Sequence, residues 1–245
     1  MLKPRIAVFV SGGGTNFQAL IDAEACGRLN SGTLALVIAS KAGVFALERA
    51  KRAGIDCETV ARAAFATQEA YEESLLAVLN RHNIDVIVLA GFMHILSAKF
   101  VSRYPDRIVN VHPSLIPAYC GKGFYGIKVH EAVLAAGESE TGATVHMVNE
   151  VPDGGRILMQ QRVPVFASDT PETLQRRVME QAEWVLLPRA VEQICADWIE
   201  REKAGATMKQ KDLFEVLKSN PYPGRGIVLG LTPDGKKAAL AYFSM

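Results

Sequence analysis

The sequence of 245 residues has no apolar run long enough to cross a membrane, no basic run and almost no excess charge. A membrane-spanning helix needs about 20 consecutive apolar residues, so we expect no membrane partner. The 27 Lys and Arg are balanced by 26 Asp and Glu, which gives a formal net charge of +1. Nothing therefore draws the chain electrostatically to nucleic acid or to anionic lipid, and neither is an expected partner.

Cysteine is scarce, and its four positions are isolated: Cys26, Cys57, Cys120 and Cys195. None has the spacing to another cysteine or to histidine that zinc sites require, so we expect no metal. Scattered thiols of this kind are typical of a reduced, cytoplasmic protein. The first apolar stretch, residues 6–10, is too short for a signal peptide and runs into glycines, so no leader is expected.

Short apolar runs alternate with amphipathic segments along most of the chain. The expected strands are residues 6–10, 34–39, 57–60, 86–89 and 107–109, and the expected helices begin near residues 17, 45, 69 and 129. Strands that are apolar on both faces and alternate with helices predict a mostly parallel, doubly wound α/β sheet with helices on both faces. Two alternating strands, residues 141–148 and 157–165, and a long helix over residues 171–199 are expected to complete it.

The composition changes near residue 200. Charged and small residues over 201–208 predict a linker, placed at 204–208 between a domain of residues 1–203 and a C-terminal fragment of residues 209–245. The expected elements of this fragment are a helix at residues 209–217 and two apolar strands at 227–231 and 238–243, joined by a turn. Because an isolated hairpin is marginal in water, this short α+β fragment is expected to be part of a truncated domain. The alternative is an extension that packs on the first domain.

The most informative pattern is Asn-Val-His-Pro-Ser-Leu-Ile-Pro, residues 110–117. It follows a strand-like segment and contains two prolines, which strand interiors do not tolerate. Asn110 and His112 are two positions apart at a strand end, so their side chains point the same way. Asp153 stands beside two glycines on an expected loop. Each residue alone could merely cap a strand or begin a turn, but amide, imidazole and carboxylate together predict acyl or formyl transfer.

A second pattern, Ser-Gly-Gly-Gly-Thr-Asn at residues 11–16, lies between the first expected strand and a helix. Backbone N–H groups and the helix dipole favour a phosphate at such a place, although a tight turn would look the same. A dinucleotide-binding motif would need glycine at Phe17 and an acidic residue where the second strand ends in Ser40 and Lys41. No Gly-Lys-Ser/Thr follows, so the loop is not a P-loop.

These two motifs, with LAGFMHIL (residues 89–96) and TGATVHMV (residues 141–148), resemble the folate-dependent glycinamide ribonucleotide formyltransferase family, over about residues 5–199. The resemblance implies a Rossmann-like fold and formyl transfer from 10-formyltetrahydrofolate to the amine of glycinamide ribonucleotide, a step of purine biosynthesis. The glycine loop argues against a methionyl-tRNA formyltransferase. A formyltetrahydrofolate hydrolase, which usually brings an extra amino-terminal domain, and a non-catalytic folate- or nucleotide-binding module are the alternatives.

The resemblance also implies roles for individual residues. Asn110, His112 and Asp153 are the expected catalytic residues. The expected nucleotide-binding residues are Gly14, Thr15, Asn16, Pro113 and Glu183. The expected folate-binding residues are Gln68, Met93, His94, Ile95, Leu96, Asn110, Asn149, Glu150, Val151, Pro152 and Asp153. Many family members have arginine at the positions of Gln68 and His94, so the electrostatic part of folate recognition is expected to differ here.

The sequence leaves several other roles open. Glu183 could instead lie on a solvated helix face. The remaining histidines, His82, His130 and His146, are expected to be surface or hydrogen-bonded strand residues rather than catalysts. Residues 220–231 and 233–243 resemble the opening of an archaeal-type inosine monophosphate cyclohydrolase, which implies a fused cyclohydrolase domain of which only the beginning is present.

Overall fold

The computed structural model describes residues 3–218, 226–231 and 238–243, with the side chains of residues 3–204. The chain divides into two compact units, Met1–Ile199 and Glu200–Met245. The strands of the first unit are β1 Arg5–Val10, β2 Thr33–Ala39, β3 Asp56–Thr59, β4 Val86–Leu89, β5 Ile108–His112, β6 Glu140–Met147 and β7 Ile157–Pro164. The helices are α1 Thr15–Ala25, α2 Phe45–Ala53, η1 Arg62–Ala64, α3 Gln68–Arg81, α4 Ala98–Val101, α5 Ile127–Ala135, α6 Pro171–Val178, the π-helical η2 Met179–Glu183 and α7 Trp184–Lys218.

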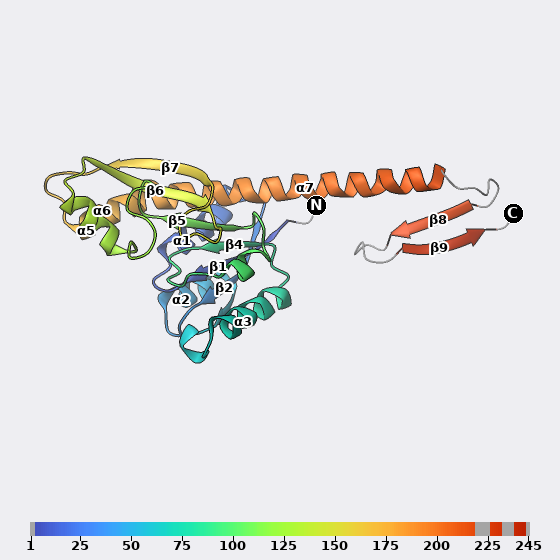
Figure 1. Ribbon diagram of the computed structural model, residues 1–245, viewed down its shortest axis with the longest axis horizontal. Coiled ribbons are helices and arrows are strands. Elements are labelled where there is room, and N and C mark those ends of the chain that lie inside the picture. The colour runs from blue at the N-terminus through green and yellow to red at the C-terminus, as the bar shows by residue number, and fades with distance from the viewer. Residues whose placement is uncertain (1–2, 219–225, 232–237, 244–245) are drawn as a thin grey trace. The chain divides into compact units, whose positions relative to one another are not determined.

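The strands of the first unit form one seven-stranded sheet in the order β3-β2-β1-β4-β5-β6-β7 (Figure 1). Pairing is parallel from β3 to β5, and β6 and β7 add antiparallel strands at one edge. The chain runs outward from β1 to β3 and then returns to place β4 on the other side of β1. Ligands of doubly wound sheets bind at such a switch point, outside the carboxyl ends of the strands. The predicted fold class is confirmed.

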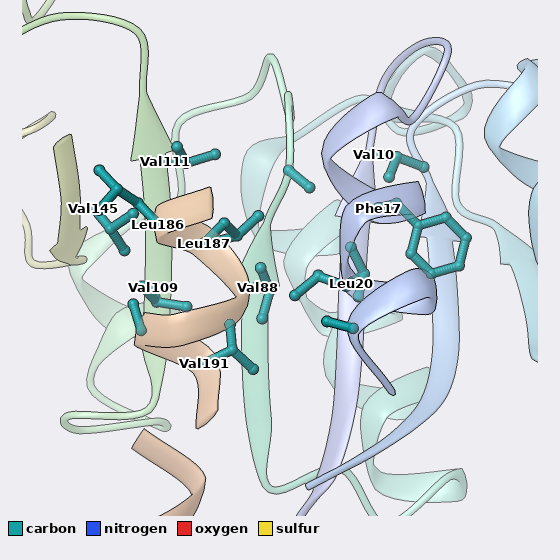
Figure 2. Packing of buried hydrophobic residues seen from close by; sticks show 14 of the residues in the cluster. Val10, Phe17, Leu20, Val88, Val109, Val111, Val145, Leu186, Leu187 and Val191 are labelled. Carbon is teal, nitrogen blue, oxygen red and sulfur yellow. The ribbon is translucent and has the colours of Figure 1, made fainter. Parts of the chain in front are cut away.

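Alternate residues of each central strand point into two separate cores. Ile6, Val8 and Val10 of β1 face the first core, whereas Ala7 and Phe9 face the second. This is why the strands appear in the sequence as continuous apolar runs. In Figure 2, helices α1 and α7 cover the first core, with Leu187 and Val191 of α7 packed beside the sheet.

Helices α3 and α4 cover the second core, on the opposite face of the sheet. Tyr71, Leu75 and Leu79 of α3 lie one and two turns apart and are fully buried there. Thr67 caps α3 by accepting a hydrogen bond from the backbone N–H of Ala70, which satisfies one of the free donors of the first turn. Burial on both faces makes the sheet a rigid support for the loops at its carboxyl edge.

The observed elements differ from the sequence prediction in two places. Strand β5 does not end at residue 109, because hydrogen bonding to β4 and β6 continues it to His112. The predicted linker at residues 204–208 is helical, because α7 continues to Lys218. Residues 204–208 are Ala-Gly-Ala-Thr-Met, in which Ala and Met are good helix formers, and the single Gly205 does not stop the helix. The division into domains at residues 203 and 209 stays a prediction.

In the second unit, β8 Gly226–Leu231 pairs with β9 Ala238–Phe243 in antiparallel register, with Leu229 opposite Leu240. The two predicted strands are confirmed. The predicted turn between them falls at residues 232–237, outside the described residues. Among the helices that the structure describes, none is long and apolar enough to cross a membrane.

Candidate active site

A cavity of about 780 Å³ lies at the switch point, at the carboxyl ends of β1 and β4. Its walls come from segments that are far apart in the sequence. They are residues 11–16, 89–96, 110–113, 121–126, 148–149 and 151–153, with His130, His146, Gln175, Met179 and Glu183. A cavity of this size fits a small molecule with room for a second.

The Asp153 carboxylate is the centre of a charge cluster in this cavity. Oδ2 lies 3.6 Å from His112 Nδ1, and Oδ1 lies 3.5 Å from His146 Nε2. Oδ2 also accepts a hydrogen bond of 2.8 Å from the backbone N–H of Gly121. Burial raises the pKa of Asp153, but the His146 hydrogen bond, the charge of His112 and the Gly121 N–H outweigh it and hold this pKa below its usual range. Asp153 is therefore a partly buried anion at neutral pH.

The backbone at Asp153 is strained. Its φ of 55° is a left-handed conformation that non-glycine residues rarely adopt. Such conformations persist where the surroundings hold them, and they cluster at functional sites. Here the neighbouring Gly155 cannot be replaced without movement, because a Cβ would lie 1.7 Å from the Met147 carbonyl oxygen. The two glycines after Asp153 thus let the loop pack against β6.

Asn110 and His146 face each other across the β5–β6 pair. Asn110 Nδ2 lies 3.1 Å from His146 Nε2 and 3.4 Å from Asp153 Oδ1. His146 Nδ1 lies 2.9 Å from the Met147 carbonyl, which can only accept, so this nitrogen carries a proton. His146 Nε2 lies between the Asn110 amide and Asp153 Oδ1, so it can accept from the amide when the ring is neutral and donate to Asp153 when the ring is charged. The strand pair thus sets the orientation of the amide.

His112 is held from both sides. Its Nε2 donates to the Tyr119 carbonyl at 2.8 Å, and its Nδ1 faces Asp153. Tyr119 belongs to the segment of residues 113–119 that follows β5 and contains Pro113 and Pro117, here called the elbow. Thr144 of β6 supports this elbow, because its hydroxyl donates to the Ser114 carbonyl at 2.6 Å and accepts from the Ile116 N–H at 3.1 Å. The elbow therefore fixes the imidazole through the backbone.

Glu183 and Asn16 form a buried pair at another wall. Glu183 is only 6% exposed, and its Oε2 accepts a hydrogen bond of 2.5 Å from Asn16 Nδ2. Burial raises the pKa of Glu183 to about 7, and the Asn16 hydrogen bond lowers it in part. The alternative of a solvated helix face is wrong, because the π-helical turn η2 directs this residue inward.

His130 is a buried histidine that lines the same cavity. Neither of its ring nitrogens has a hydrogen-bond partner among the described residues. Burial, followed by the charge of His112, lowers the pKa of His130 to about 4. The ring is therefore neutral at physiological pH and offers both a donor and an acceptor.

The opposite wall of the cavity is apolar. Met93 is 52% exposed, Ile95 is 62% exposed and Val151 is 55% exposed. Exposed apolar side chains gathered around a cavity are typical of a ligand site. This wall suits a flat, weakly polar ring system.

The formyl transferase family model matches residues 4–191, most of the chain. The chain is 43% identical to phosphoribosylglycinamide formyltransferase of Escherichia coli (strain K12) over 176 residues, which cover 72% of this chain and 80% of the relative.

The chain belongs to the formyl transferase family.

A crystal structure of phosphoribosylglycinamide formyltransferase from Brucella melitensis matches with a TM-score of 0.72 and 40% identity, covering 80% of this chain and 97% of that one. The trifunctional purine biosynthetic protein adenosine-3 of Chironomus tentans is 38% identical over 198 residues. These cover 80% of this chain but only 14% of that relative, so the chain spans a small part of the longer, trifunctional protein.

The cavity of this formyltransferase brings together most of the residues that the sequence singles out. Asn110, His112 and Asp153 meet at its centre. Lining residues on the expected nucleotide side are Gly14, Thr15, Asn16, Pro113 and Glu183, and on the expected folate side Met93, His94, Ile95, Leu96, Asn149, Val151 and Pro152.

Gln68 and Glu150 are not among the described residues that line the cavity. The Gln68 side chain instead bonds to Glu72 and to the Ile95 carbonyl.

Sequence reasoning missed His146 as part of the cluster of Asn110, His112 and Asp153. It is a hydrogen-bonded strand residue, as expected, but its partner is Asn110. The strand register would have revealed this contact, because Asn110 lies directly opposite His146 when β5 and β6 pair. Predicting it would have required knowing that these two strands are antiparallel neighbours.

Proposed function

We propose that this enzyme transfers the formyl group of 10-formyltetrahydrofolate to the amine of glycinamide ribonucleotide, giving formylglycinamide ribonucleotide. The observation that carries the proposal is the Asn110, His112 and Asp153 cluster, which stands between a glycine loop on one side and an apolar wall on the other. The identity to phosphoribosylglycinamide formyltransferase of Escherichia coli supports it. Both proposed substrates are small molecules.

The nucleotide side is proposed at the glycine loop. Gly14, Thr15 and Asn16 lie at the start of α1, where free backbone N–H groups and the helix dipole attract a phosphate. Pro113 forms part of the wall beside it. Asn16 Oδ1 is buried and has no hydrogen-bond partner among the described residues. We assign this acceptor and the Glu183 carboxyl to the ribose hydroxyls or the amine of the nucleotide.

We place the folate at the apolar wall, which is formed by residues 93–96, Asn149 and residues 151–153. Met93, Ile95 and Val151 offer the apolar surface that an aromatic ring system needs. His94 replaces the arginine of many relatives. Burial, followed by the charge of Arg62, lowers the pKa of His94, so this residue is neutral at physiological pH. Folate recognition at this position therefore depends on packing rather than on charge.

Formyl transfer requires stabilisation of an oxyanion and transfer of a proton to the departing folate nitrogen. Both N–H groups of the Asn110 amide are directed at His146 and Asp153, and the 3.4 Å contact to Asp153 is the weaker. If the Asn110 amide gives up its contact with Asp153, this N–H can donate instead to the developing oxyanion. Such an interaction is worth about 3–4 kcal/mol when well placed. His112, oriented by Asp153, stabilises the same charge when protonated and moves the proton.

A coupled assay with the purified chain tests the proposal. 10-Formyltetrahydrofolate should be consumed only when glycinamide ribonucleotide is present. Consumption without the nucleotide would identify a formyltetrahydrofolate hydrolase, in which water replaces the amine. Binding of both ligands with no consumption would identify a non-catalytic module.

We further propose that residues 209–245 are the first part of a cyclohydrolase-like domain, and that the enzyme works in the cytoplasm. The resemblance of residues 220–231 and 233–243 and the antiparallel β8–β9 pair support the first point. The four free cysteines support the second. An assay of residues 1–245 for cyclohydrolase activity should give none, because the resemblance covers only residues 220–231 and 233–243.

A further inference from the structure

Buried side chains of α3 hold the loop of residues 90–97, which carries the apolar wall of the cavity. Glu72 is only 4% exposed, yet it is a carboxylate. Its Oε1 accepts a hydrogen bond of 2.6 Å from the backbone N–H of Ser97, and its Oε2 accepts from the Ser97 hydroxyl. A buried carboxylate is costly unless such donors surround it. Glu72 is therefore committed to this end of the loop.

Gln68, one turn earlier on α3, completes the same anchor. Its Nε2 donates to Glu72 Oε1 at 2.7 Å and to the Ile95 carbonyl at 3.0 Å. Its Oε1 accepts from Arg62 Nε at 3.3 Å. Both amide N–H groups are thus in use inside the protein. Gln68 contacts the backbone of the wall rather than the cavity.

The other end of the loop is fixed by the strand-end residue Ser11. The Met93 N–H donates to Ser11 Oγ at 3.0 Å, and the Ser11 N–H donates to the Gly91 carbonyl at 3.1 Å. The backbone of the loop is therefore held from two sides. The side chains of Met93 and Ile95 are left exposed between the two anchors.

We propose that Glu72 and Gln68 are positioning residues for the formyl donor. By fixing the backbone at Ile95 and Ser97, they set the shape of the apolar wall on which the folate ring packs. The proposal rests on the proposed function, because it takes folate to be the ligand of this wall. Since the glycine loop is held by other contacts, loss of the anchor weakens folate binding and spares nucleotide binding.

Two variants test this on the full chain by isothermal titration calorimetry. Glu72→Gln keeps the size of the side chain but turns an NH₂ group toward the donors of Ser97, and Gln68→Ala removes the donor to the Ile95 carbonyl. Each should raise the Kd for 10-formyltetrahydrofolate about tenfold and leave the Kd for glycinamide ribonucleotide within about twofold. Glu73→Gln, at an exposed position of the same helix, is the matched control and should change neither.

Unchanged folate affinity in the variants would overturn the proposal, as would an equal loss of affinity for both ligands. If buried Glu72→Gln does not fold, the half-buried Gln68 position still decides the question. Binding is measured without turnover, which separates this proposal from the proposed function. A wild-type chain that binds folate but transfers no formyl group would contradict that function alone.

Discussion

At the scale of single residues, the proposed chemistry depends on one partly buried anion, Asp153, and the groups arranged around it. Asp153 keeps its charge in the protein interior because His146, His112 and the Gly121 N–H surround it. Removing any of these groups leaves the rest with an unbalanced charge or an unpaired donor. Because we place these groups at the reacting atoms, the effects of substituting them should appear mainly in turnover.

We expect His112→Ala and Asp153→Asn each to lower kcat by about 10²–10⁴-fold while KM for both substrates changes little. The reason is that these groups act on charge and protons that develop in the transition state. Steady-state kinetics of the two variants measure this. Turnover within a few-fold of wild type would remove that residue from the mechanism.

A pH effect is expected from Glu183. Its folded-state pKa of about 7 lies above the ordinary glutamate pKa of 4.5, so between these values the native protein keeps a proton that the unfolded chain releases. This contribution to stability is complete below about pH 4.5 and is lost as pH rises toward 7. Glu183→Gln, which cannot ionise, should gain about 1–3 kcal/mol relative to wild type between pH 5 and pH 7.5.

Urea unfolding of both proteins at the two pH values measures this difference. The Glu183→Gln variant should also bind the nucleotide more weakly while folate binding is unchanged. A difference in unfolding free energy that does not vary with pH would show that Glu183 is already ionised in the native protein at pH 5.

At the scale of elements, helix α2 shapes the glycine loop. Gly14 has a φ of 72°, and a Cβ there would lie 2.7 Å from the Cβ of Ala46. Arg49 Nε donates to the Gly13 carbonyl at 2.8 Å, and the Ala46 N–H donates to the Gly12 carbonyl at 3.3 Å. The loop is thus pressed against α2, and only glycine fits at position 14.

Gly14→Val should raise the KM for glycinamide ribonucleotide about tenfold, because it distorts the proposed phosphate site, and should leave the folate KM nearly unchanged. Inorganic phosphate should compete with the nucleotide and not with folate. Inhibition studies against each substrate measure this. Phosphate that competed with folate alone would place the phosphate site elsewhere.

At the scale of the whole molecule, every residue that lines the cavity belongs to the first unit, and Glu183 is the last of them. A chain truncated after residue 206 should therefore keep formyltransferase activity. Among the residues that the structure describes, β8 and β9 pair only with each other. Open strand edges favour association, so truncation should also improve monodispersity. Steady-state rates, thermal unfolding and light scattering of the two chains test this. Lost activity or a large fall in Tm would show that the C-terminal residues stabilise the first unit.

The sequence by itself determined most of the elements and the fold class, and it singled out the residues that we propose to be catalytic. Strands buried on both faces appear as continuous apolar runs, so β1, β2 and β4 were predictable from local pattern. The position of Asn110 and His112 beside prolines was equally local. The helical continuation of α7 through residues 204–208 was not predicted, because our interpretation gave more weight to the small residues here and to the charged residues before them than to the helix formers Ala204, Ala206 and Met208.

Only the tertiary structure decided which distant groups meet. His146 reaches Asn110 through antiparallel pairing of β5 and β6, and Glu183 reaches Asn16 across 167 residues of sequence. Gln68 turned toward Glu72 rather than into the cavity. Such contacts depend on strand order, register and helix packing, which are set by burial across the whole sheet and leave no local pattern in the chain.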